Sequence, residues 1–199
     1  MLKTYIACPK KFHFKYIKGI SMPVNDETFE LGKNIHALAS YYLKNENISK
    51  MEQALNERER LIWEYLKKVS YFSYKTIGTE YNLSVKVGDY FFGGRLDALV
   101  KDGETYYILD YKTGSAPKNA KYDFQTIIYL LAVKTFFNTE KVIFVYLDLK
   151  NKDEVKIELT NELISEYQKI LLDTAEKIKK DLFEKKNKTC NCEYSKICY

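Results

Sequence analysis

Two aspartates and a lysine are spaced to act together on one face of a predicted β-hairpin. Asp110 and Lys112 stand two residues apart at the end of a predicted strand, and the turn signal Asp102-Gly103 precedes that strand. A two-residue type I′ turn needs positive φ at both central positions, and Asp-Gly is a preferred sequence for it. Because strand side chains alternate, this turn puts Asp97 on the face of Asp110 and Lys112, with the two carboxylates diagonal neighbours at about 7 to 8 Å.

Converging carboxylates beside a lysine suit metal-dependent hydrolysis of a phosphodiester. Two ionised aspartates aimed at one point repel unless they are protonated or bind a cation, and Mg²⁺ or Mn²⁺ favours such oxygen ligands. The cation would polarise the phosphate and acidify a water, while the lysine would position or deprotonate that water and offset negative charge. The alternative is an exposed hairpin whose aspartates and lysine form ordinary salt bridges.

The remaining sequence predicts the elements that must hold this hairpin. Apolar residues recur at helical spacing over residues 1 to about 70, and a strand pattern runs from about Glu80 to Lys112. Further elements are predicted as a helix from about Asp123 to Phe137, strands over 142–149 and 154–159, and a long amphipathic helix from 160 to about 186. The predicted fold class is α/β: a mixed β-sheet core flanked by helices, with an N-terminal helical region and a cysteine-bearing C-terminal tail.

The chain is predicted to form one domain. It has 199 residues, with no internal repeat, low-complexity block or Pro-, Gly- or Ser-rich linker. Within this domain we predict a helical region over 1–79, a core over 80–159, and a C-terminal helix with a cysteine tail over 160–199. The composition, 46% hydrophobic and 15% aromatic, excludes a disordered or collagen-like chain.

Charge alone does not indicate a nucleic-acid partner, since 32 basic and 27 acidic residues leave a formal net charge of only +5. Lysines do gather near both ends, from Lys3 to Lys18 and from Lys177 to Lys188. If the ends meet they would form one basic surface, and otherwise they are two solvated faces. No apolar run approaches the roughly 20 residues of a membrane helix, so we expect a cytoplasmic protein with no membrane partner.

Four short motifs, taken in order, resemble those of a known nuclease family. They are Gly32-Lys33-Asn34-Ile35-His36, Gly93-Gly94-Arg95-Leu96-Asp97, Ile108-Leu109-Asp110-Tyr111-Lys112-Thr113-Gly114 and Gln125-Thr126-Ile127-Ile128-Tyr129. Over nearly the whole chain the sequence resembles the RecB-like branch of the PD-(D/E)XK nucleases, and within it the CRISPR-associated exonuclease family Cas-four. The resemblance implies a restriction-endonuclease-like fold and DNA as the substrate.

The resemblance also implies roles for individual residues. Asp97, Asp110 and Lys112 would be the catalytic residues. His36 would join the two aspartates and the main-chain carbonyl of Tyr111 in holding Mn²⁺ or Mg²⁺, and imidazole is an ordinary ligand of transition metals.

A further pair, Gln125 and Tyr129, would contact DNA or orient the site by the same resemblance. Their spacing of four residues puts both on one face of a helix, which also suits an ordinary helical pair. Glu80, at the start of the predicted strands, could add an acidic ligand or a group that supports the ligands.

The four cysteines resemble the split set of iron–sulfur nucleases in this family. Cys8 lies near the start, and Cys190, Cys192 and Cys198 lie near the end. Four thiolates suit a 4Fe-4S cluster, which would join the termini and whose loss would cost stability and DNA binding. A single residue separates Cys190 from Cys192 where the family pattern has two, so a Cys₄ zinc site and unligated thiols remain alternatives.

The function implied by the resemblance is an exonuclease on single-stranded DNA ends that trims DNA before its capture by a CRISPR integrase complex. One alternative is a RecB-like nuclease for repair or replication, with the same site and another partner. The other is a DNA-binding scaffold whose nuclease site is inactive, against which the intact Asp97, Asp110 and Lys112 argue.

Overall fold

The computed structural model describes residues 1–22, 27–180, 182–185 and 192–198. Its strands are β1 (Lys75–Val87), β2 (Tyr90–Asp102), β3 (Thr105–Lys112), β4 (Val142–Asp148) and β5 (Asp153–Glu158). Its α-helices are α1 (Leu2–Ala7), α2 (Pro9–Phe12), α3 (Glu27–Leu43), α4 (Ser49–Ala54), α5 (Glu57–Leu66), α6 (Phe124–Phe137) and α7 (Asn161–Lys179). Shorter turns are the π-helix η1 (His13–Ile17) and the 3₁₀ helices η2 (Ser70–Ser73), η3 (Ala120–Tyr122) and η4 (Ser195–Ile197).

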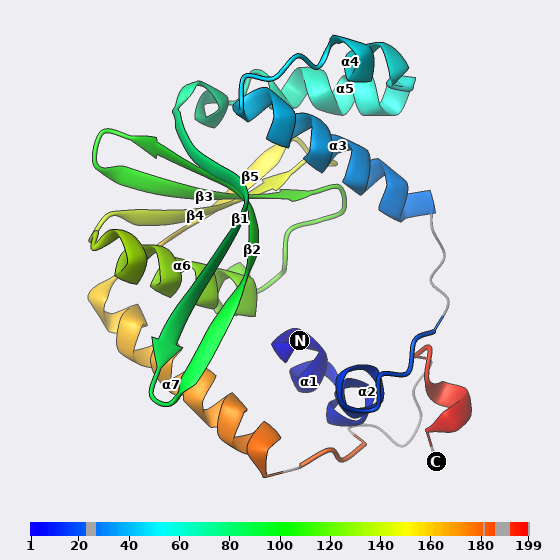
Figure 1. Cartoon of the computed structure of the whole chain (residues 1–199), viewed down its shortest axis with the longest axis vertical. Helices are drawn as coiled ribbons and strands as arrows, with labels where there is room; N and C mark the ends of the chain where they lie inside the picture. The colour runs from blue at the N-terminus through cyan, green and yellow to red at the C-terminus, as the bar shows by residue number, and fades with distance from the viewer. Residues whose placement is uncertain (23–26, 181, 186–191, 199) are drawn as a thin grey trace.

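The strands form one mixed sheet in the order β1-β2-β3-β4-β5, in which only the β3–β4 pair is parallel. Helices α6 and α7 pack on one face, and α3 and α5 pack on the other (Figure 1). The predicted α/β class with a helix-flanked mixed sheet is therefore confirmed. Among the helices described, none combines the length and apolar character needed to cross a bilayer.

The sequence accounts for where helix α6 begins and where it ends. The Asp123 side chain caps it by accepting a hydrogen bond from the Gln125 backbone N–H at 2.9 Å, and Asn138, with φ 47°, ends it in the left-handed conformation. Its residues 126–133 are all buried, because it lies between the sheet and α7. The predicted helix from Asp123 to Phe137 is confirmed.

Helix α7 is shorter than predicted, ending at Lys179 instead of near residue 186. The residues beyond it pack elsewhere: the Phe183 ring stacks on Phe12 at 6.0 Å between centroids and approaches His13 at 4.8 Å. The Tyr5 hydroxyl donates to the Leu182 carbonyl at 3.0 Å. Tertiary contacts with the first helices thus replace the last turns of the predicted helix.

The two ends of the chain meet (Figure 1). Segment 192–198 packs on the first helices through an ion pair between Lys11 and Glu193 at 2.8 Å and a bond from the Tyr194 hydroxyl to the Ile20 carbonyl at 2.7 Å. We call α1, α2, η1 and residues 182–185 and 192–198 the terminal assembly. The two ends of the chain therefore meet, as the first of the two predicted arrangements required, while Lys186 and Lys188 of the predicted basic run lie outside the described residues.

Two boundaries differ from those predicted. The first strand begins at Lys75, inside the region expected to be helical. The first half of this strand is only partly buried and lacks a clear alternation, so its sequence carries no strand signal. The β2–β3 turn is centred on Gly103 and Glu104, since Asp102 pairs with Thr105. Gly103 has φ 53°, and glycine at the first central position suits a type II′ turn. The shift still leaves Asp97, Asp110 and Lys112 on one face, because it preserves the alternation.

Candidate active site

The candidate site lies where β2 and β3 separate. Their ladder ends at the pair Ala98–Leu109, and the Asp97 side chain then takes over: its Oδ2 accepts the Tyr111 backbone N–H at 2.9 Å. We call this place, formed by Asp97, Asp110 and Tyr111, the seam. A carboxylate thus satisfies a backbone donor that the sheet leaves unpaired.

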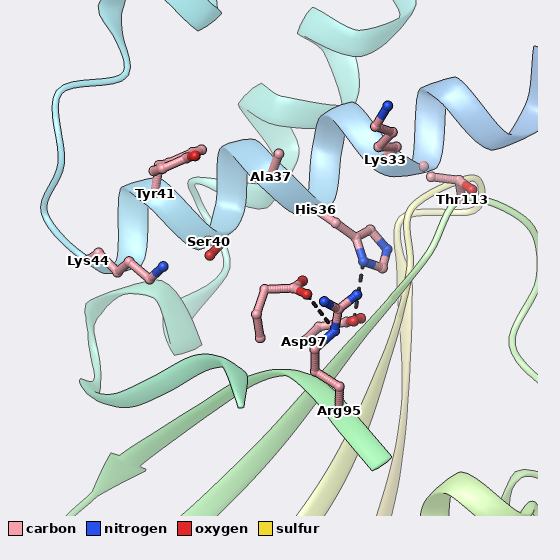
Figure 2. Close-up of a pocket in the computed structure, with 11 residues that line it drawn as sticks. Lys33, His36, Ala37, Ser40, Tyr41, Lys44, Arg95, Asp97 and Thr113 are labelled. Atoms are coloured by element: carbon pink, nitrogen blue, oxygen red, sulfur yellow. Dashed lines mark ion pairs between the residues drawn. The ribbon is translucent and has the colours of Figure 1, made fainter. Parts of the chain in front are cut away.

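His36 on α3 lies over the seam, and both of its ring nitrogens face acceptors (Figure 2). Nδ1 lies 3.2 Å from Asp97 Oδ1, and Nε2 lies 2.9 Å from the Tyr111 carbonyl oxygen. Burial lowers the pKa of His36, but the hydrogen bond and charge of Asp97 outweigh it and raise this pKa above its ordinary value. The surroundings of His36 therefore favour the protonated, positively charged imidazole.

Asp110 and Lys112 form an ion pair beside His36, with Nζ and Oδ2 2.5 Å apart. Asp110 is only 4% exposed. Burial raises its pKa to about 6, with Lys112 acting in the opposite direction and the nearby Asp97 raising it further. The two aspartates therefore sense each other's charge. The observed register, continued past the Ala98–Leu109 pair, puts Asp97 opposite Asp110, whereas the predicted register made them diagonal neighbours.

Helix α6 brings its two motif residues to the seam in different ways. The Gln125 amide nitrogen donates to Asp110 Oδ1 at 3.3 Å, and its carbonyl oxygen lies 3.5 Å from Lys112 Nζ. The Tyr129 hydroxyl instead donates to the Arg95 backbone carbonyl at 2.9 Å. A Cβ on Gly94 would lie 2.5 Å from the Tyr129 hydroxyl oxygen, so glycine is needed for this contact.

Three side chains offer ligand atoms that all lie within 4.8 Å of one another: His36, Glu80 and Asp97. Glu80 lies on β1 between the pairs Thr79–Ala98 and Tyr81–Leu96, with φ 49°, and its Oε2 is 2.8 Å from Arg95 Nε. Two ligands bound at right angles about 2.1 Å from one cation are about 3 Å apart. The distance from His36 Nδ1 to Asp97 Oδ1 matches that spacing, so these two donors and Glu80 suit a divalent cation. The Tyr111 carbonyl oxygen lies at the other ring nitrogen, Nε2.

The predicted ligand set and this cluster overlap without being identical. His36, Asp97 and the Tyr111 carbonyl are brought together as predicted, whereas the 4.8 Å group contains Glu80 and not Asp110. The ion pair with Lys112 accounts for the difference, because it holds the Asp110 carboxylate on the α6 side.

Two groups that support the site were not predicted as such. Lys3 Nζ donates to the Gln125 carbonyl oxygen at 2.7 Å and lies 2.8 Å from Asp123 Oδ1. Lys3 and Gln125 are 122 residues apart in sequence, so no local pattern links them. Asp123 had a visible signal as a helix cap, but nothing indicated that it would also hold Lys3.

Cys8, Cys192 and Cys198 lie away from the seam, in the terminal assembly. Cys8 caps α2, where its Sγ lies 3.5 Å from the Lys11 backbone nitrogen, and Cys198 is buried. Within the described ranges, Cys8, Cys192 and Cys198 do not bring all three sulfurs within 4.8 Å of one another. The predicted ligand Cys190 lies outside the described residues.

Fold, seam and motif order together define a class of protein. A family model described as the PD-(D/E)XK nuclease superfamily matches residues 1–74 and 58–199. The chain belongs to the PD-(D/E)XK nuclease superfamily. Nucleic acid is the substrate class that this membership implies.

More particular similarity is to CRISPR-associated exonuclease Cas4 of Francisella tularensis subsp. novicida (strain U112), at 31% identity over 121 residues. The alignment covers 59% of this chain and 61% of that relative, so it spans about three fifths of each. The fold is similar to a crystal structure from Eubacterium rectale that is provisionally described as an exonuclease. That match has a TM-score of 0.60 at 12% identity and covers 96% of this chain and 84% of the other.

Proposed function

We propose that this protein is a divalent-metal-dependent deoxyribonuclease that acts as an exonuclease on single-stranded DNA ends. One observation carries the proposal: a histidine, a carboxylate and a main-chain carbonyl converge at the seam, directly beside a second carboxylate and a lysine. Superfamily membership supports the same chemistry. The catalytic residues are Asp97, Asp110 and Lys112.

The cation, Mn²⁺ or Mg²⁺, is held by His36, Asp97, Asp110 and the carbonyl of Tyr111, with Glu80 close enough to assist. When bound, it supplies a Lewis acid that polarises the scissile phosphate and acidifies a water.

Lys112 acts on the water and on developing charge. Its Nζ contacts the Asp110 carboxylate and lies near the Gln125 carbonyl oxygen, so two acceptors fix its direction. From there it positions or deprotonates the attacking water and offsets negative charge on the phosphate. Gln125 orients both Asp110 and Lys112, and Tyr129 fixes the β2 backbone at Arg95.

A cavity of about 600 Å³ beside the seam provides space for the DNA backbone. Its α3 wall carries Lys33 and Lys44 with Tyr41, and its β2 wall carries Arg95 (Figure 2). Basic side chains along a groove attract phosphates whatever the sequence of the strand. This supports DNA binding along α3, leading to Asp97.

The finer proposal concerns the cellular role. The similarity to CRISPR-associated exonuclease Cas4 supports trimming of DNA before spacer acquisition, with an integrase complex as the partner. We propose that residues 1–199 act as one nuclease domain, in which the terminal assembly extends the core that begins near Glu80.

End-labelled single-stranded DNA incubated with Mn²⁺ tests the nuclease proposal. The wild type should shorten the strand stepwise from an end, whereas Asp110→Ala and Lys112→Ala should lower kcat by about 10²- to 10⁴-fold. Glu104→Ala is the matched control, because it removes a carboxylate that is exposed at the far end of the same hairpin. Equal degradation by the wild type and both seam variants would refute the proposed site.

We also propose that Cys8, Cys190, Cys192 and Cys198 hold an iron–sulfur cluster, of the 4Fe-4S type. The support is the meeting of the two ends, where Lys11, three residues after Cys8, pairs with Glu193, the neighbour of Cys192. Such a cluster joins segments that the chain alone connects only over a long distance, and so stabilises the terminal assembly.

Anaerobic purification tests the cluster. The protein should be brown and contain about four iron atoms per chain, and Cys198→Ser should lose colour and iron. Colourless protein that carries stoichiometric zinc would replace the cluster by a zinc site.

A further inference from the structure

The outer half of β2 has an open edge next to the seam. β2 pairs with β1 along nearly all of its length, but with β3 only from Ala98 to Asp102. Within the described part of the chain, residues 90–97 therefore have no strand on their other side, and α1 and the start of α6 lie across this edge (Figure 1). Between them is a cavity of about 490 Å³.

This cavity is mainly aromatic and apolar, with lysines at its margin. Its lining includes Leu2, Phe91, Phe124 and Tyr129. Phe91 is 74% exposed, a large apolar surface to leave in water on a strand. Lys86, paired with Phe91 across the hairpin, holds its Nζ 5.9 Å from the Phe91 ring centroid.

The cavity is continuous with the seam. Gln125, Tyr129 and Lys3 all line it, and Gln125 also contacts Asp110. A molecule in this cavity would therefore share a wall with the catalytic groups. Lys86, which lies beside the Phe91 ring and outside the lining, favours an occupant with negative charge, while Phe91 offers a flat apolar face. Lys3 lines the cavity and already pairs with Asp123.

We propose that this cavity binds a nucleobase of the DNA strand, stacked on Phe91, with the adjoining phosphate near Lys86 or Lys3. A nucleotide combines the flat π face and the anion that this lining complements, and stacking on aromatic side chains is tolerant of base identity. Bases in a duplex already stack on each other, so the cavity selects single strands. This inference rests on the proposed function, and it identifies the site at which the nuclease holds the single strand.

The proposed stacking site lies some distance along β2 from the catalytic residues. Phe91 precedes Asp97 by six residues on one strand, or about 20 Å at about 3.3 Å per residue. The stacked base therefore belongs to a nucleotide several positions from the scissile phosphate.

Binding without cleavage tests the stacking site. With EDTA present, labelled oligo-dT is titrated with the wild type, Phe91→Ala, and the control Phe136→Ala, which removes a phenyl ring that is 61% exposed near the end of α6. Phe91→Ala should weaken binding about 5- to 100-fold, and Phe136→Ala should not change it. Duplex of the same length should bind all three proteins equally.

A tryptophan probe gives a second readout that a general loss of affinity would not mimic. Phe91→Trp should keep wild-type affinity, and its new emission should be quenched when oligo-dT binds, whereas the native Trp63, 1% exposed, should not respond. Wild-type affinity of Phe91→Ala, or unquenched emission at saturation, would overturn the stacking site.

The result separates the two proposals. Loss of affinity in Phe91→Ala without any hydrolysis by the wild type would refute the nuclease and keep the stacking site. Normal hydrolysis by the wild type with unchanged affinity in Phe91→Ala would keep the nuclease and refute the stacking site.

Discussion

The seam draws its groups from neighbouring strands, whereas the terminal assembly joins segments from opposite ends of the chain. At the seam, Asp97 and Tyr111 meet because the hairpin register puts them together, and His36 is added from α3. In the terminal assembly, Phe12 meets Phe183 and Lys11 meets Glu193 although the whole sheet lies between them in the sequence. The first region is thus set by local pairing, and the second by tertiary packing.

Because of this difference, substitutions at the seam and in the terminal assembly should have different effects. A change at the seam should affect chemistry, because its groups touch the reacting atoms. A change in the terminal assembly should affect stability and leave the chemistry largely intact, because its contacts with the seam pass mainly through Lys3.

The largest effect should come from Gly94→Ala, which tests how tightly the seam is packed. A Cβ there would approach the Tyr129 hydroxyl oxygen to 2.5 Å, so Tyr129 must move and lose its bond to the Arg95 carbonyl. We expect the free energy of unfolding to fall by about 1–3 kcal/mol in urea titrations, with a large loss of hydrolysis. Gly114→Ala, with nothing within 4 Å of its Cβ, should behave like the wild type.

Phe183→Ala should break the terminal assembly while sparing the seam. Phe183 contacts the rings of Tyr5, Phe12 and His13, so its removal should lower the free energy of unfolding by about 1–2 kcal/mol. The kcat of the folded protein should be unchanged. Leu182→Ala, at an exposed neighbour, is the control, and equal destabilisation by both would contradict the packing role of Phe183.

The seam should also respond to pH. The pKa of Asp110 is raised from 3.8 to about 6, and that of His36 is raised above 6.5. Because both folded-state values exceed the unfolded ones, each group contributes stability that is present below its ordinary pKa and is lost as pH rises through the folded pKa. Metal-free protein should therefore lose stability at the seam between about pH 4 and pH 6 as Asp110 titrates, and again above pH 6.5 as His36 loses its proton.

A divalent cation competes with those same protons, so its stabilising effect should grow with pH. We expect the rise in Tm on adding Mn²⁺ to be larger at pH 8 than at pH 5. The increase should be absent in His36→Ala, and a rise that is independent of pH in the wild type would contradict the pKa directions at the seam.

The smallest effect should come from Lys3→Ala, which sharpens the comparison because Lys3 links the two regions. It loses an exposed ion pair with Asp123 and a bond to Gln125, so kcat should fall only about two- to fivefold. Lys141→Ala, which removes a more exposed ion pair with Glu104 far from the seam, should leave kcat unchanged.

The sequence predicted what depends on alternation and short spacing. Asp97, Asp110 and Lys112 shared a face even though the turn lay one residue further along than predicted, because a shift that keeps the parity keeps the face. Gln125 followed from the four-residue helical period. These features are local, so pattern and register determine them.

The rest depended on contacts that no local pattern encodes. The left-handed backbone of Glu80 and its ion pair with Arg95 arise within the β1–β2 pairing, a few residues after the register shift between Thr76 and Gly78. Likewise, α7 ends early because Leu182 and Phe183 pack on the first helices, a gain that outweighs further helical hydrogen bonds. In both places tertiary packing outweighs the local conformational propensity of the sequence.

Equilibrium Mn²⁺ binding to the metal-free protein, measured by titration calorimetry, tests the central claim most directly. At pH 8 the wild type should bind at the seam, and His36→Ala and Asp97→Ala should each lose that binding, while Glu104→Ala retains it. Undiminished Mn²⁺ binding by both seam variants would contradict a metal centre at the place where β2 and β3 separate.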